Sequence, residues 1–182
     1  MPADHPQRRD FAFPPVSEDQ LQATEAALGF SFPLVLRTLY TRLANGGFGP
    51  GAGLLSALSE DHSHSNETAR TFVDDYHFHN QVGYAALKQS EPVQLIDLAD
   101  YTLHWQSIPT ERERLLLPYA VWPAQLLTLE DLGCCQDAYL DCKTGLVFCT
   151  APTENDKEYE LVLIADSLEE YLEHWLQGEM LP

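Results

Sequence analysis

The chain has 182 residues, a length typical of one domain, and its 45% hydrophobic share supplies a core and excludes a disordered chain. Its formal net charge of −18 excludes direct binding to nucleic acids or anionic membranes and favours basic partners. No segment approaches the ~20 consecutive apolar residues of a membrane span, and no secretory signal is visible, so we expect a cytoplasmic protein.

The N-terminal part predicts two short helices after a loose leader over residues 1–15. A capping box at Ser17–Gln20 begins the first helix, and Gly29 ends it in the left-handed conformation. Pro33 begins the second helix, and Asn45-Gly46-Gly47 ends it. The apolar spacing predicts these core-facing positions: Leu21, Thr24, Ala27, Leu28, Leu36, Leu39, Tyr40 and Leu43.

The middle of the chain has weaker signals. Leu54-Leu55 resembles an edge strand, and residues 59–115 form a variable insertion in a single domain over 16–182. Within the insertion we expect a polar loop over 59–66, a helix around 67–76 and a helix over 95–105.

The C-terminal third predicts strands and then a helix. Strands are expected at 115–121, at 158–164, and in a hairpin whose arms, 139–142 and 146–149, flank Gly145. A second capping box at Ser167 precedes a helix that ends at Gly178, with this apolar stripe: Leu168, Tyr171, Leu172, Trp175 and Leu176. The fold class is therefore α+β, a mostly antiparallel twisted sheet with N-terminal helices and a C-terminal helix packed on it.

An ordered series of these features resembles the SUKH superfamily, the Smi–Knr type of glucan-synthesis regulators. The series comprises Glu25-x-x-Leu28-Gly29, Phe32-Pro33, Asn45-Gly46-Gly47, Gly49-Pro50, Leu117-Pro118, Gly133-Cys134, Asp166 to Leu172 and Trp175-Leu176-x-Gly178. The resemblance implies an α+β domain that binds proteins and has no shared catalytic motif. Bacterial members are commonly immunity proteins against polymorphic toxins of the nuclease or deaminase type, and fungal members are similar to scaffolds in cell-wall signalling.

No motif predicts catalysis or a cofactor. The Gly-rich segment 45–53 lacks the Gly-Lys-Ser/Thr ending of a phosphate-binding loop, and no nucleophile elbow surrounds a serine. The pairs His62/His64 and His77/His79 have the spacing of metal ligands only if they lie on strands, and solvated loop histidines are favoured. The four cysteines, Cys134, Cys135, Cys142 and Cys149, do not form two Cys-x-x-Cys pairs and are expected to be reduced thiols.

Acidic residues after Pro118 are the candidate partner-binding site. This part of the chain holds 13 acids and only two bases. The candidates are Glu130, Asp131, Asp137, Asp141, Glu154, Asp156, Glu158 and Glu160, with Trp122 as a possible aromatic anchor. Together with the resemblance, they favour an immunity protein that occludes the active site of a basic toxin. The alternative is a regulatory or scaffold protein of the Smi–Knr type with a non-toxin partner.

Overall fold

The computed structural model describes residues 13–50, 53–58, 71–82, 93–98, 106–107, 113–133, 136–151, 153 and 158–179. The helices in these ranges are α1 (Glu18–Leu28), α2 (Leu34–Arg42), α3 (Phe72–His77) with a π-helical continuation (Phe78–Val82), and α5 (Leu168–Gln177). The strands are β1 (Gln94–Ile96), β2 (Gln106–Ser107), β3 (Glu113–Pro118), β4 (Val121–Pro123), β5 (Leu126–Gly133), β6 (Gln136–Asp141), β7 (Val147–Ala151) and β8 (Glu158–Ala165).

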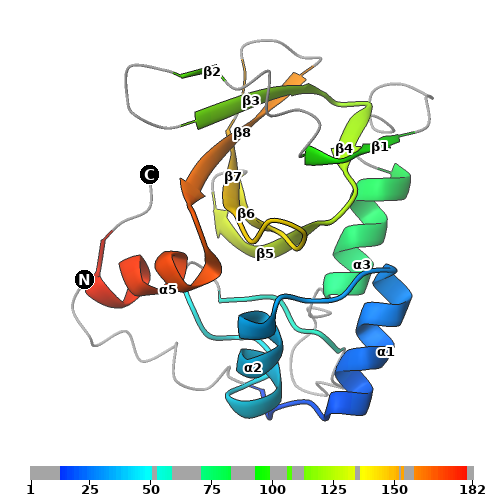
Figure 1. Ribbon diagram of the computed structural model, residues 1–182, viewed down its shortest axis with the longest axis vertical. Coiled ribbons are helices and arrows are strands. Elements are labelled where there is room, and N and C mark those ends of the chain that lie inside the picture. Colours follow the sequence, from blue (N-terminus) through cyan, green and yellow to red (C-terminus); the bar gives the residue numbers. More distant parts are fainter. Residues whose placement is uncertain are drawn as a thin grey trace.

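Six strands form one antiparallel sheet in the order β2-β3-β8-β7-β6-β5. The short strands β1 and β4 pair in parallel beside it. In Figure 1 the strands curl around a common centre, with α1, α2 and α5 below them and α3 at the side. This arrangement confirms the predicted α+β class and the mostly antiparallel sheet, while the parallel β1–β4 pair was not anticipated.

The curled sheet separates two apolar cores. On its outer face, residues of β5 to β8 such as Leu140 and Ile164 pack with the helices around Leu21, Leu36 and Tyr171. Inside the curl, Trp122, Tyr139 and Phe148 lie in a second cluster with residues of β1, β3 and β8. Strand residues alternate between these two clusters because successive side chains point to opposite faces.

The helix ends follow the sequence closely. Ser17 Oγ accepts a hydrogen bond from the Gln20 amide at 3.2 Å, and the Gln20 side chain accepts one from the Ser17 amide at 2.9 Å. Gly29 and Gly178 adopt φ of 84° and 74°, which confirms both left-handed ends. At the second capping box, Ser167 Oγ caps the Glu170 amide, whereas the Glu170 carboxylate reaches the Asp166 amide instead of the Ser167 amide.

Some predicted core positions are wrong. Ala27 is exposed, and the buried Glu25 replaces it on the inner face of α1, where its carboxylate pairs with Arg37 and accepts from the Phe32 amide. Leu43 and Leu176 are also exposed; Leu43 directly follows α2, and Leu176 lies in the last turn of α5.

Several predicted element boundaries also need correction. Leu54 and Leu55 form no strand, and the nearby Ser56 makes only an isolated bridge to Thr71. The strand expected over 115–121 ends at Pro118 and turns before β4. Residues 94–96 form β1 in place of a helix, and β5 was not predicted at all.

Candidate partner-binding surface

Three of the predicted contact residues are buried in the chain, which corrects that part of the prediction. Glu130 is 0% exposed and its carboxylate accepts a hydrogen bond from the Tyr171 hydroxyl. Asp141 is 3% exposed. Trp122 is also 3% exposed and stacks on the His79 ring with centroids 4.4 Å apart. Glu130 and Trp122 pack against their own chain and are not available to a partner in this fold, whereas Asp141 is nearly covered and lines a pocket.

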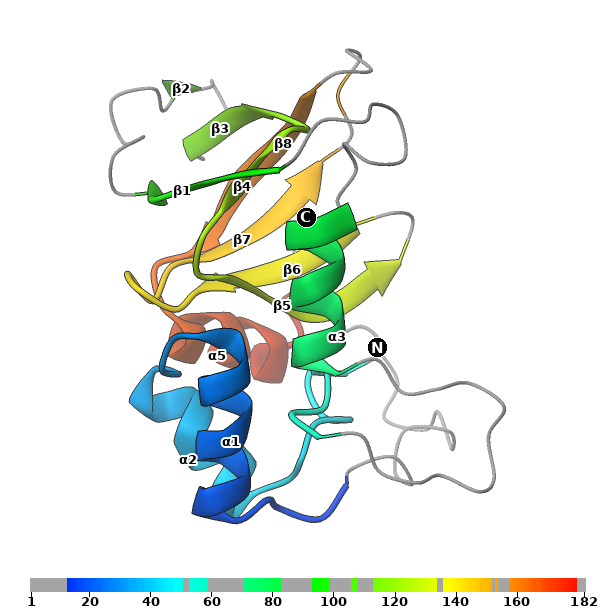
Figure 2. The same cartoon turned by 90° about the vertical axis from the view of Figure 1, so that its right-hand side faces the viewer.

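Four predicted acids form a surface that we call the acidic end, namely Asp131, Asp137, Glu158 and Glu160. Asp131 lies directly opposite Asp137 in the β5–β6 ladder, where β5 ends and β6 begins. Glu158 and Glu160 lie at the start of β8, and Glu160 is opposite Ala151 at the end of β7. Antiparallel pairing therefore brings all four to the same end of the sheet, where the arrowheads of β5 and β7 point in Figure 2.

The two pairs lie on opposite faces at that end. Asp137 precedes Ala138, which belongs to the outer core, so Asp137 and Asp131 lie on the inner face. Glu160 is opposite Leu116 and two residues before Val162 of the outer core, so it lies on the outer face. The acidic end is thus a rim around the sheet end. Glu154 and Asp156 lie outside the described residues.

Contacts within the chain act on the carboxylates of this rim. Arg114 pairs with Glu160 at 3.2 Å and offsets the charge of that carboxylate. Directly opposed carboxylates such as Asp131 and Asp137 destabilise a ladder. The Tyr139 hydroxyl donates to Asp137 at 3.1 Å, and its dipole reduces part of that repulsion.

The acids of α5 form a separate surface. Glu169 and Glu173 are exposed, and Leu176 beside them is 74% exposed. The eight residues of β8, at roughly 3.3 Å each, place α5 about 25 Å from the acidic end. The structure therefore divides the predicted acidic surface into two patches, and the described residues do not form one continuous track.

The histidine and cysteine predictions are tested only in part. His79 is 3% exposed and its Nε2 lies 3.4 Å from Asp75 Oδ2, beneath Trp122 and Tyr139, so it is a core residue. Within the described ranges, no group of three or more His, Cys, Asp or Glu side chains could hold a metal ion. Neither Cys142 nor Cys149 forms a disulfide, and burial raises the pKa of the Cys142 thiol. His62, His64, Cys134 and Cys135 lie outside the described residues.

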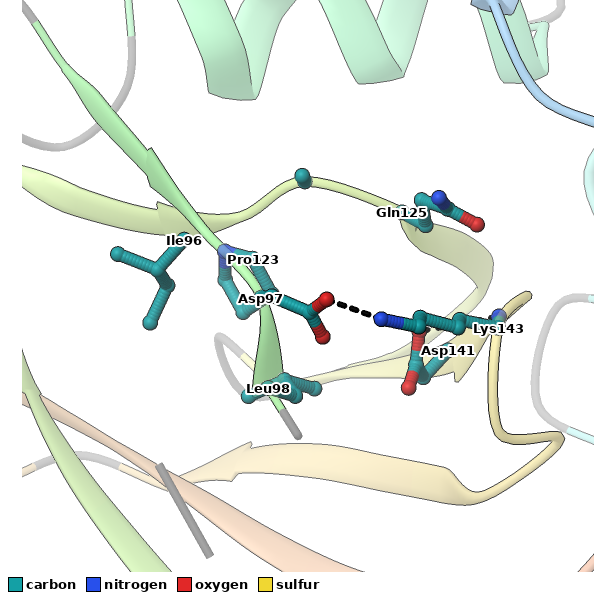
Figure 3. Close-up of a pocket in the computed structure, with 8 residues that line it drawn as sticks. Ile96, Asp97, Leu98, Pro123, Gln125, Asp141 and Lys143 are labelled. Carbon is teal, nitrogen blue, oxygen red and sulfur yellow. Dashed lines mark hydrogen bonds and ion pairs between the residues drawn. The ribbon is translucent and has the colours of Figure 1, made fainter. Parts of the chain in front are cut away.

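Sequence reasoning missed a pocket that involves Asp97. The pocket lies between the β1–β4 pair and the β6–β7 turn, and Asp97 forms an ion pair with Lys143 across it (Figure 3). Asp97 fell inside the predicted helix over 95–105, so nothing suggested that it would meet a residue of the hairpin. Its cavity volume of about 40 Å³ is far below the roughly 300–1,000 Å³ of small-molecule sites.

These features define an acidic α+β domain with one group of carboxylates at the end of a curled antiparallel sheet and a second group on α5. No helix in the part of the chain that the structure describes is long and apolar enough to cross a membrane. The model of the SMI1 / KNR4 family (SUKH-1) matches residues 15–174, and the chain belongs to this family. Searches of curated proteins and of solved structures returned no significant match.

Proposed function

We propose that this chain is a non-enzymatic, protein-binding module that neutralises a basic toxin of the nuclease or deaminase type by covering its active site. The acidic end carries this proposal, because it concentrates carboxylates where a surface that grips phosphates could dock. Family membership agrees with a protein-binding role. The toxin partner follows from what bacterial members of the family commonly bind, and we extend it to this chain as a proposal.

Charge would govern how quickly the complex forms. Complementary fields can raise association rate constants to ~10⁸–10⁹ M⁻¹s⁻¹ at low salt. The Debye length of ~8 Å at physiological ionic strength limits what these carboxylates contribute once the partners are docked. Slow dissociation therefore needs an apolar contact as well.

Leu116 supplies an exposed apolar side chain beside the acidic end. It is 46% exposed and lies opposite Glu160 in the β3–β8 ladder, on the outer face. Pro118 is opposite Glu158 in the same ladder. This pairing places apolar and acidic groups side by side, so Leu116 replaces the buried Trp122 as the proposed anchor.

Co-expression with the protein encoded next to this chain tests the toxin role. We expect that neighbour to arrest growth, co-purify with this protein and lose its toxicity when the two are expressed together. If the neighbour is harmless, or if it remains toxic in the presence of this protein, the toxin proposal is wrong.

Two variants of equal charge change test the binding surface. D131N/E158Q removes two carboxylates from the acidic end, whereas E169Q/E173Q removes two from α5. D131N/E158Q should slow association with the neighbouring protein at least tenfold at low salt. E169Q/E173Q should change the logarithm of the association rate constant less than half as much. Equal effects would show that overall charge, and not the acidic end, drives binding.

The alternative is a regulatory or scaffold module with a non-toxin partner. Leu176 favours an apolar contact on α5, because it is 74% exposed at the helix end. A complex formed there would be weakened by Leu176→Ser and would depend little on salt. Such a result with a harmless neighbour would support this alternative.

A further inference from the structure

The pocket beside the β6–β7 turn joins apolar walls to two carboxylates. Ile96, Leu98, Pro123 and Ala124 form its apolar surface, and Asp97, Gln125, Asp141 and Lys143 contribute polar groups (Figure 3). Its chemistry matches a long basic side chain, whose methylene stem packs on apolar surface while its charged head reaches an acid.

A cation of the chain itself already binds there. Lys143 Nζ contacts Asp97 Oδ2, and the two side chains are 47% and 35% exposed. Exposed ion pairs of this kind contribute little to stability, so a competing cation can displace the Lys143 ammonium from Asp97. The contact thus shows which ligand chemistry the pocket accepts.

The backbone of the β6–β7 turn is held by hydrogen bonds that do not involve the side chain of Lys143. Asp141 Oδ1 accepts from the Lys143 backbone amide at 3.2 Å, and Oδ2 accepts from Thr144 Oγ1 at 2.6 Å. These bonds fix the backbone, whereas only the flexible side chain of Lys143 reaches Asp97. Each carboxylate oxygen of Asp141 can also accept more than one hydrogen bond, so it can receive a second donor.

We propose that this pocket binds one arginine side chain of the partner protein. The guanidinium replaces the Lys143 ammonium at Asp97, and its planar fork provides the further donors that Asp141 and Gln125 can accept. Lys143 is a displaceable internal occupant that shields Asp97 until the partner binds. This inference rests on the proposed function for the identity of the partner, but not for the existence of the site.

Ethylguanidinium, an arginine side-chain analogue, is the probe for a direct test. It is titrated into the full chain at constant ionic strength, balanced with sodium chloride, while the backbone amides of Asp97, Asp141 and Lys143 are followed by NMR. Lys143→Met keeps an apolar stem and removes the competing charge. This variant should bind ethylguanidinium up to about fivefold more tightly, because an exposed ion pair near the upper limit of its usual strength no longer competes. The double variant D97N/K143M should lose this gain.

The control is Glu173→Gln, which changes an exposed carboxylate of α5 outside the pocket and should leave the titration unchanged. The dispersion of the amide spectrum shows whether each variant is folded. Saturable shifts in K143M that disappear in D97N/K143M support the site. Shifts that do not saturate, or that are identical in the two variants, overturn it.

The partner provides a second measurement that separates this inference from the proposed function. Asp97→Asn should weaken binding to the neighbouring protein, and Lys143→Met should strengthen it. If the complex forms but neither variant changes its affinity, the pocket inference fails while the proposed function stands. If guanidinium binds as expected but no complex forms, the pocket stands and the proposed function fails.

Discussion

Removing the hydroxyl of Tyr171 tests whether Glu130 belongs to the core or to the binding surface. Tyr171→Phe keeps the buried ring and deletes the hydrogen bond to the Glu130 carboxylate, which is 0% exposed. Hydrogen bonds to charged groups contribute roughly 1.5–3 kcal/mol, and neither Glu130 nor the emptied space can recover that from bulk water.

The expected loss is large enough to measure directly. In a chain of this size, 1 kcal/mol corresponds to roughly 2–4 °C in Tm, so Tyr171→Phe should lower Tm by about 3–12 °C. Urea unfolding followed by circular dichroism gives the matching decrease in the free energy of unfolding. Asp131→Asn is the control, and its exposed position predicts a change within roughly 0.5 kcal/mol.

The same pair of residues separates stability from binding. Glu130→Gln should destabilise the fold and leave the affinity of the folded protein for its partner unchanged. A Tyr171→Phe variant as stable as the parent would refute the buried hydrogen bond. A Glu130→Gln variant that is fully stable but binds weakly would restore Glu130 to the binding surface.

Three further predictions concern the scaffold. Gly46→Ala should lower the free energy of unfolding in urea by more than about 2 kcal/mol, whereas Gly29→Ala should lower it by roughly 1–2 kcal/mol. Both glycines have φ of 84°. A Cβ at Gly46 would lie 2.7 Å from the Leu54 and Leu55 carbonyl oxygens, whereas a Cβ at Gly29 has open space. Asn45→Ala should lower stability by about 2–4 kcal/mol, because the Asn45 side chain accepts from the Ala57 amide at 2.8 Å and donates to the Leu58 carbonyl at 3.2 Å; an unchanged Tm would contradict this. Burial raises the pKa of Tyr40, Tyr159 and Tyr171. Their contribution to stability is therefore complete below the unfolded-state pKa of about 10 and decreases as the pH rises above it. The urea midpoint should fall above that pH, and a midpoint that rises would contradict the burial of these tyrosines.

Local signals in the sequence were sufficient for the helix ends and the hairpin. A capping box or a glycine at a left-handed position encodes its structure within a few residues, and Ser17 and Gly145 behave accordingly. The exposure of Leu43 and Leu176 could not be predicted in this way, because the period of a helix shows which face is apolar but not how far along the helix the tertiary packing extends.

Non-local contacts account for what the sequence did not reveal. The sequence predicts Glu130 as a surface acid, yet its partner is Tyr171, 41 residues away. The bulge after Thr128 interrupts the alternation of β5, which hides the strand from a two-residue pattern. The pairing register of strands β5 to β8 brings these acids to one end of the sheet, namely Asp131, Asp137, Glu158 and Glu160. That register depends on tertiary contacts, so the sequence alone does not reveal it.

The salt dependence of association provides the most direct test of the acidic end as the binding surface. Stopped-flow association with the co-purified neighbouring protein should slow steeply as ionic strength rises, and D131N/E158Q should both slow it and flatten that dependence, unlike E169Q/E173Q. An association rate that is insensitive to salt, or a D131N/E158Q variant that associates as fast as the parent, would contradict the central claim.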